Sequence, residues 1–134
     1  METIRTIYKG NLRTEATHVK SGEKIITDAP VDNHGKGEAF SPTDLLSASL
    51  GSCMMTLMGI AARTHNIDLD DCSMKITKIM ASDPRRVTEI IIEFNIPGKK
   101  FEEKEKAILE RAAITCPVAL SLHPSLKQTV QFTY

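Results

Sequence analysis

Cys53 and Cys116 are the residues of this chain with the clearest capacity for chemistry. Cys53 lies inside a long apolar segment, whereas Cys116 directly precedes Pro117. Because a proline disfavours helical geometry in the residue before it, Cys116 falls at a junction between helices, where its thiol can move. A rigid thiolate can attack a peroxide oxygen and become a sulfenic acid, which a hinged second thiol then captures as a disulfide. The pair is typical of a peroxide-reducing thiol system.

Cys53 taken alone has a simpler interpretation. Leu50 and Leu57, three residues before it and four after it, share its face of a helix, and so does Ile60. A cysteine on such a face is most often a small and inert core residue. The functional interpretation of Cys53 therefore depends on Cys116.

The cysteine count sets the redox context. Three cysteines, an odd number without CxxC spacing, form neither a secreted disulfide framework nor a standard zinc motif. We therefore expect reduced thiols and no metal site. The third cysteine, Cys72, opens a strand and is expected to be a structural or half-exposed thiol.

Size and composition fit one soluble globular domain. The chain has 134 residues, with 17 Lys and Arg against 17 Asp and Glu, so its formal net charge is zero. A nucleic-acid-binding protein would show a basic surplus or an aromatic stacking platform, and this chain has no Trp, two Tyr and four Phe. We therefore expect a single domain over residues 1–134 that does not bind nucleic acid.

Residues 45–62 raise the question of a membrane. The segment is uncharged and reaches the minimum length of a membrane-spanning helix. Its Ser and Thr residues, the charges of Asp44 and Arg63 beside its ends, and the single occurrence of such a segment favour a helix buried in a protein core. The N-terminal residues contain no apolar signal-peptide region, so we predict a cytoplasmic protein without a membrane partner.

The pattern of apolar and turn-forming residues predicts an α+β fold. The expected strands span 3–9, 12–20, 23–27, 72–81, 86–96 and 127–134. The expected helices span 42 to about 65, 101–115 and 117–122, and a Gly-rich loop covers 28–40. We predict antiparallel sheets packed around the long central helix. Apolar and small residues surround the axis of that helix, so it should be covered on most sides.

Ser41, Pro42 and Asp44 predict where the long helix begins. Ser41 can cap the helix, Pro42 suits the first helical position, and Asp44 completes a capping box with Ser41. Asp44 thus has a sufficient structural explanation.

The segments SPTDLLSASLGSCMMTLM and TCPVALSL resemble the two cysteine motifs of the OsmC/Ohr family of thiol peroxidases. The first is of the P-x-[ED]-L-L-x-A-x-x-x-x-C type, and the second is Cys-Pro followed by a small or aromatic residue. The resemblance covers nearly the whole chain. It implies an OsmC-like fold in an intertwined homodimer, with Cys53 as the peroxidatic thiolate and Cys116 as the resolving thiol. It also implies reduction of an organic hydroperoxide by a dithiol, without a metal or bound cofactor.

The Ohr branch of the family also uses an arginine on the second strand. Arg13 resembles that arginine. Beside a buried thiol, its guanidinium would lower the thiol pKa and hold the peroxide oxygens. The alternative for Arg13 is a solvent-facing position on its strand.

The Ohr branch further uses a glutamate just before the central helix, and here the sequence departs from it. Thr43 occupies that position, ten residues before Cys53, and the adjacent acid is Asp44. We expect either Asp44 or the loop residue Glu38 to orient Arg13. This departure is more similar to the broader OsmC-like branches. His34, in the same loop as Glu38, is either part of a lid over the site or an ordinary surface residue.

Two other functions fit the same residues. A non-catalytic dimer that binds a small molecule or lipid would use Cys53 only as a wall residue, and a redox sensor or another thiol enzyme would use it on a different substrate. A peroxidase differs from these because Cys53 must be a low-pKa thiolate that forms a disulfide with Cys116. The Met residues around Cys53 favour an organic hydroperoxide, since they suit an apolar pocket.

Burial gives a second argument for the homodimer. The strands of one 134-residue chain are too few to cover the long apolar helix on all sides. A second copy would complete the core.

Overall fold

The computed structural model of the protein describes residues 1–97 and 100–134. Within this part of the chain, residues group into two compact units, Met1–Leu46 and Ser47–Tyr134. The boundary between the units falls inside the long helix α1 (Pro42–Thr64). The single domain expected over residues 1–134 stays a prediction.

The first unit is a three-stranded antiparallel sheet followed by a loop. Its strands lie side by side in chain order and are β1 (Ile4–Gly10), β2 (Arg13–His18) and β3 (Lys24–Asp28). The turn between β1 and β2 requires positive φ angles, which Gly10 and Asn11 supply at 83° and 56°. The loop after β3 contains one short 3₁₀ helix, η1 (Val31–Asn33). The three predicted strands of this unit are confirmed.

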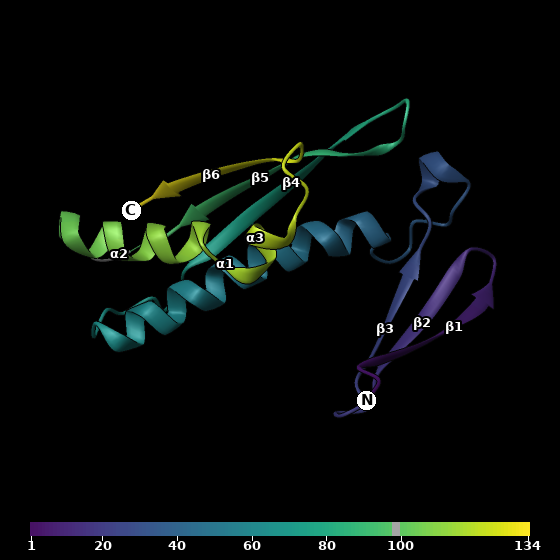
Figure 1. Ribbon diagram of the computed structural model, residues 1–134, viewed down its shortest axis with the longest axis horizontal. Coiled ribbons are helices and arrows are strands. Elements are labelled where there is room, and N and C mark those ends of the chain that lie inside the picture. The colour runs from purple at the N-terminus through teal and green to yellow at the C-terminus, as the bar shows by residue number, and fades with distance from the viewer. Residues whose placement is uncertain (98–99) are drawn as a thin grey trace. The chain divides into compact units, whose positions relative to one another are not determined.

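The second unit is a three-stranded sheet with helices packed on one face (Figure 1). After α1, its elements are β4 (Ser73–Ala81), β5 (Arg86–Asn95), α2 (Glu103–Ile114), α3 (Pro117–Ser121) and β6 (Lys127–Thr133). Leu50 and Met54 of α1, Ile92 and Phe94 of β5, and Leu109 of α2 are buried together in one core. The α+β class and the predicted order of elements are confirmed.

The sheet of the second unit is mixed, so the expectation of wholly antiparallel sheets was wrong. β4 runs antiparallel to β5, but β6 runs parallel to β5, with Val130 opposite Ile92. The chain between β5 and β6 carries α2 and α3, and a crossover of this kind is how two adjacent strands become parallel. Periodicity predicted each strand but contains no information about its direction.

α1 buries one face and exposes the other. Its buried residues are Ser47, Leu50, Gly51, Met54, Met58 and Ala62. On the opposite face Ile60 is 56% exposed, and Ser52 and Thr56 are exposed as well. The chain alone therefore leaves one face of the helix uncovered, as expected for a chain whose strands are too few to cover it on all sides. The apolar stripe predicted around Cys53 is buried at Leu50 but not at Ile60.

Among the residues that the structure describes, α1 alone is long and apolar enough to cross a membrane. That property concerns length and composition only, and core helices of soluble proteins share it. The buried apolar residues Leu50, Met54, Met58 and Ala62 of α1 belong to the core of the second unit, as predicted for a core helix.

Close packing at Gly51 sets α1 against the sheet. A Cβ atom at this position would lie 2.5 Å from Ile76 Cδ1 and 3.0 Å from Met74 Sδ, both on β4. A larger residue would force these side chains to move, because protein cores leave little spare volume. Gly51 thus allows a close approach of α1 to β4 just before Cys53.

Candidate functional site

Cys116 is the residue that caps the N-terminus of α3. Its backbone is extended, with φ −68° and ψ 151°, and Pro117 begins the helix. Its Sγ accepts a hydrogen bond from the backbone N–H of Ala119 at 3.4 Å. The predicted place of Cys116 between two helices is confirmed, and the Cys-Pro step explains it.

Cys53 and Cys116 are in contact within the second unit. Cys116 is fully buried in the core of the second unit, half-buried Cys53 on α1 packs against that core, and the two thiols are close enough for Cys53 to raise the pKa of Cys116. All three cysteines of the chain are free thiols. The fold therefore brings together the two thiols that the sequence analysis paired.

Burial raises the pKa of the Cys116 thiol, and the neighbouring Cys53 raises it further. Hydrogen bonds from the backbone N–H groups of Ala119 and Val118 act in the opposite direction, because they stabilise a thiolate. The net shift is upward, so Cys116 stays protonated at neutral pH. A protonated thiol is a weak nucleophile, as suits a thiol that reacts second.

Gln128 holds α3 from the side of β6. Its Nε2 donates a hydrogen bond to the carbonyl oxygen of Ala119 at 2.9 Å. The same residue, Ala119, donates its N–H to Cys116 Sγ. The position of the Cys116 thiol thus depends on β6, which no sequence pattern links to the cysteines.

The first unit contains a separate charged cluster around Arg13. Arg13 and Asp28 are register partners on β2 and β3, and the guanidinium Nε and Nη2 donate to the two Asp28 carboxylate oxygens at 2.7 and 2.8 Å. The Asp28 side chain is 1% exposed and that of Arg13 is 30% exposed. The hydrogen bond and charge of Arg13 hold the pKa of Asp28 below its usual value. In turn, Asp28 raises the pKa of Arg13, so the pair is ionised at neutral pH.

Glu38 is the second carboxylate at Arg13. Its Oε1 lies 3.5 Å from Arg13 Nη2, and its backbone N–H donates to Asp28 Oδ2 at 3.1 Å. Glu38 thus contacts Arg13 as one of the two expected acids, but Asp28 makes the shorter, bidentate contact. Asp28 was not among the expected site residues, because it was expected to begin the loop at residues 28–40. The cross-strand register of Arg13 with Asp28 is the signal that would have found it.

The loop between β3 and α1 folds back so that Glu38 reaches Asp28. The backbone N–H of Asp28 donates to the carbonyl oxygen of Phe40 at 3.1 Å, which closes the loop at its base. A Cβ atom at Gly35 would lie 1.7 Å from the carbonyl oxygen of Ala29, so only glycine fits there. The Gly-rich composition of the loop therefore serves its folded shape.

Asp44 lies at the start of α1 and forms the predicted capping box. Its Oδ2 accepts from the Ser41 N–H at 3.0 Å, and its own N–H donates to Ser41 Oγ at 3.0 Å. Thr43, at the position of the family glutamate, places its Oγ1 3.2 Å from Ser41 Oγ. His34 is exposed in the loop before them. A role of Asp44 in orienting Arg13 at the active site and a lid role for His34 stay predictions.

The third thiol, Cys72, lies outside this pair. It is half-buried and packs against the core of the second unit, and burial raises its pKa. Within residues 1–97 and 100–134, no group of three or more His, Cys, Asp and Glu side chains is placed to hold a metal ion.

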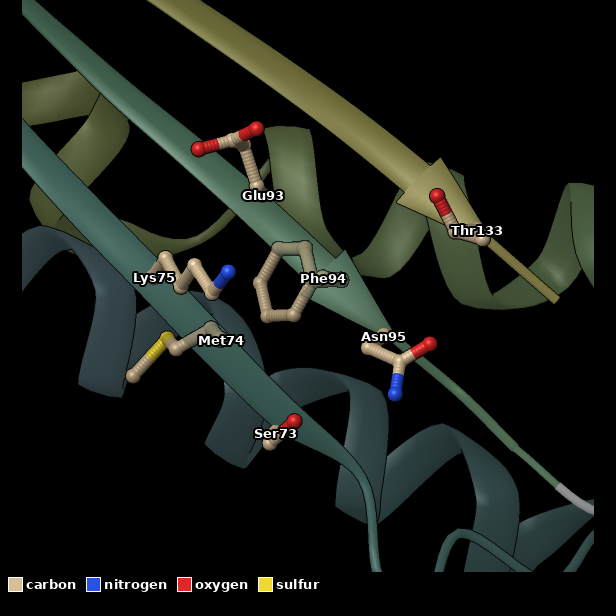
Figure 2. A pocket seen from close by; sticks show the side chains of 7 residues that line it. All are labelled: Ser73, Met74, Lys75, Glu93, Phe94, Asn95 and Thr133. Atoms are coloured by element: carbon tan, nitrogen blue, oxygen red, sulfur yellow. The ribbon is translucent and has the colours of Figure 1, made fainter.

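A pocket of about 290 Å³ lies on the sheet of the second unit (Figure 2). It is lined by Ser73, Met74, Lys75, Glu93, Phe94, Asn95 and Thr133. Lys75 on β4 and Glu93 on β5 are register partners of opposite charge. Neither Cys53 nor Cys116 lines this pocket, so it is separate from the thiol pair.

The two cysteines and the elements that hold them match a known family. The family model described as OsmC-like protein matches residues 35–131, which include α1, α3 and both cysteine motifs. The chain belongs to the OsmC-like family. The OsmC-like fold expected from the resemblance is thereby confirmed.

Solved structures extend the likeness to nearly the whole of this OsmC-like chain. A protein from Psychrobacter arcticus 273-4, for which a role in the osmotic stress and detoxification response is suggested, is 50% identical with a TM-score of 0.95, over 99% of this chain and 96% of that one. An organic hydroperoxide resistance protein, OsmC, from Legionella pneumophila is 17% identical with a TM-score of 0.77, over 100% and 98%. One from Elizabethkingia anophelis is 14% identical with a TM-score of 0.76, over 99% and 96%. The last two show a shared fold. No curated protein matches the chain.

Proposed function

We propose that this protein reduces organic hydroperoxides with Cys53 and Cys116. The observation that carries the proposal is the proximity of half-buried Cys53, which packs against the core, to Cys116, which is fully buried and protonated within it. Proteins of the same fold that are named for organic hydroperoxide resistance support it.

The proposed reaction has three steps. The Cys53 thiolate attacks one peroxide oxygen, the O–O bond breaks, and the alkoxide takes up a proton and leaves as the alcohol. Cys53 is then a sulfenic acid, and the Cys116 sulfur attacks it, with loss of water, to form the disulfide. A small dithiol reduces this disulfide by exchange and becomes a disulfide itself, which restores both thiols.

Arg13 is the proposed activating group for Cys53. Its Nε and Nη2 are held by Asp28 and Glu38, so we assign Nη1 as the donor to the peroxide oxygens. A permanent positive charge near the thiol would favour the thiolate over the thiol. We add Asp28 as the residue that positions Arg13. Asp44 is proposed to support the site by fixing the start of α1, the helix that carries Cys53.

We further propose that the protein is an intertwined homodimer. Strand alternation places Ile4, Tyr8 and Ile25 on one face of the first sheet, where they are 59%, 67% and 53% exposed. Ile60 on α1 is exposed to a similar degree. Clustered exposed apolar side chains mark interaction surfaces, and a second copy of the chain would cover them.

The cellular compartment follows from the same chemistry. The reaction needs both thiols free at the start of each cycle, and all three cysteines are free thiols. We therefore propose that the protein acts in the cytoplasm, where thiols are kept reduced.

Peroxide consumption with dihydrolipoamide as the dithiol tests the proposal. Cys53→Ser should abolish turnover of cumene hydroperoxide, because no sulfenic acid can form. Cys116→Ser should lower turnover and let over-oxidised Cys53 accumulate, which intact-mass spectrometry detects. Cys72→Ser is the matched control and should turn over cumene hydroperoxide like the wild type.

Two results would contradict the proposal in different ways. Equal or faster turnover of hydrogen peroxide would reject the preference for organic substrates. A folded wild-type protein without any turnover would reject the peroxidase and favour the ligand-binding or redox-sensing alternatives.

A further inference from the structure

The thiol pair offers two sulfur ligands without a third protein ligand beside them. Cys53 packs against the core that contains Cys116, close enough to affect its thiol, and the described residues include no group of three or more His, Cys, Asp and Glu suited to a metal ion. A zinc site that needs three or four protein ligands does not fit this arrangement. A soft, sulfur-seeking species that takes two protein sulfurs and carries its own remaining group does fit.

The apolar surroundings of Cys53 and Cys116 favour a ligand whose complex with the two sulfurs carries no net charge. Cys116 is fully buried in the same core as Leu109, Ala113 and Ala119. An ionised complex in such apolar surroundings would lose its hydration without compensation. The raised pKa of Cys116 reflects the same penalty on charge. A ligand that binds both sulfurs covalently and leaves them uncharged avoids this penalty.

We propose that the Cys53–Cys116 pair binds a monosubstituted trivalent arsenical, such as methylarsonous acid, as a cyclic dithioarsenite. The arsenic carries one methyl group and two hydroxyl groups. Each hydroxyl leaves as water with the proton of one thiol, and two As–S bonds replace two As–O bonds. Arsenic stays trivalent, nothing is oxidised or reduced, and the adduct is neutral.

The exposure of the two thiols gives the order of bond formation. Half-buried Cys53 meets the arsenical first and forms the first As–S bond. Cys116, already in contact with Cys53, closes the ring. This binding uses the same thiols as the proposed peroxide reaction but does not depend on it, since it needs neither a peroxide nor a reductant.

Retention of the arsenical should depend on the fold. The two cysteines are far apart in sequence, so an unfolded chain must lose conformational entropy to bring them together. The folded chain has already paired them. The folded protein should therefore retain the arsenical in the presence of a monothiol, because a monothiol can replace only one protein sulfur at a time. A dithiol can replace both sulfurs and should remove the arsenical.

The test mixes reduced protein with one equivalent of methylarsonous acid, adds excess glutathione, and measures the intact mass and the number of free thiols. Wild type and Cys72→Ser should retain one CH₃As group, and wild type should fall from three free thiols to one. Dihydrolipoamide should remove the group. Cys53→Ser and Cys116→Ser should lose it to glutathione, with folding checked by circular dichroism and Cys116→Ala used if the serine variant is unfolded.

Three outcomes would overturn the proposal: no adduct on folded wild type, equal retention by a single-thiol variant, or equal retention by the unfolded wild type. Each is separable from the proposed function. Peroxide turnover without an adduct leaves the peroxidase standing, whereas an adduct without turnover leaves the arsenical site standing.

Discussion

The two compact units differ in what their folding buries. In the second unit, apolar side chains such as Leu50 and Phe94 are buried in one core. In the first unit, large apolar side chains such as Tyr8 are exposed, and the buried side chains are the polar Thr27, Asp28 and Ser41. Burial of apolar surface therefore holds the second unit together, whereas hydrogen bonds and an ion pair organise the first.

The same difference separates two kinds of chemistry. The core of the second unit keeps Cys116 protonated, because burial penalises a thiolate. The first unit keeps Arg13 and Asp28 ionised, because each stabilises the charge of the other. The proposed peroxidase takes its nucleophile, Cys53, from the apolar second unit. Substitutions in each unit can test this contrast between apolar burial and ion pairing.

The largest effect on stability is expected from a substitution in the core of the second unit. Phe94 is 1% exposed and stacks on Phe132 with ring centroids 5.2 Å apart. Phe94→Ala should lower the free energy of unfolding by about 3–5 kcal/mol, because it removes buried contacts and leaves a cavity. Urea unfolding followed by circular dichroism measures this. Leu120→Ala, at a residue 73% exposed, should stay within about 0.5 kcal/mol of wild type. If both variants lost a similar free energy of unfolding, burial at Phe94 would not be what stabilises the second unit.

The exposed apolar face of the first unit is expected to matter for assembly. Tyr8→Ser combined with Ile25→Ser should weaken the proposed dimer by about tenfold or more per side chain, because each loses apolar burial against the second copy. Sedimentation equilibrium measures the dissociation constant. Ile7→Ser, on the opposite face and 57% exposed, is the control. A stable folded monomer in the wild type, or a larger effect at Ile7, would refute the interface.

The ion pair of the first unit predicts a response to acid. The pKa of Asp28 is below its ordinary value of 3.8, so its ionised form contributes stability above that value, and the contribution is lost as the pH falls through the lowered pKa. Asp28→Asn should be less stable than wild type at neutral pH, and the difference should shrink in acid. Thermal unfolding at a series of pH values measures it, with Asp32→Asn in the exposed η1 segment as the comparison. A constant difference at all pH values would contradict this account.

The smallest effect is expected at the start of α1. Ser41→Ala removes the side-chain acceptor for the Asp44 N–H and should cost about 1 kcal/mol of stability. Ser52→Ala, on the exposed face of the same helix, should cost less than about 0.5 kcal/mol. Chemical denaturation measures the free energy of unfolding of both variants. A Ser41→Ala variant as stable as wild type would show that the capping box adds nothing.

Local features of the sequence were enough to predict most elements of the fold. Ser41, Pro42 and Asp44 placed the start of α1 correctly, because a helix cap involves only neighbouring residues. Pro117 placed Cys116 between two helices for the same reason. The two cysteine motifs indicated the family, which the match over residues 35–131 confirmed.

Features that join distant segments were harder to predict. The predicted direction of β6 was wrong, and Asp28 was overlooked as the partner of Arg13. Each depends on which segments pair or pack, and residue periodicity describes only one segment at a time.

The sequence by itself thus determined the elements, the helix caps and the identity of the candidate thiols, since these follow from interactions between near neighbours in the chain. Only the tertiary structure decided that Cys53 contacts Cys116, that Asp28 holds Arg13, and that β6 lies parallel to β5. Those contacts join residues far apart in the chain. They form because burying the apolar face of α1 and pairing the strands fix the packing and the register together.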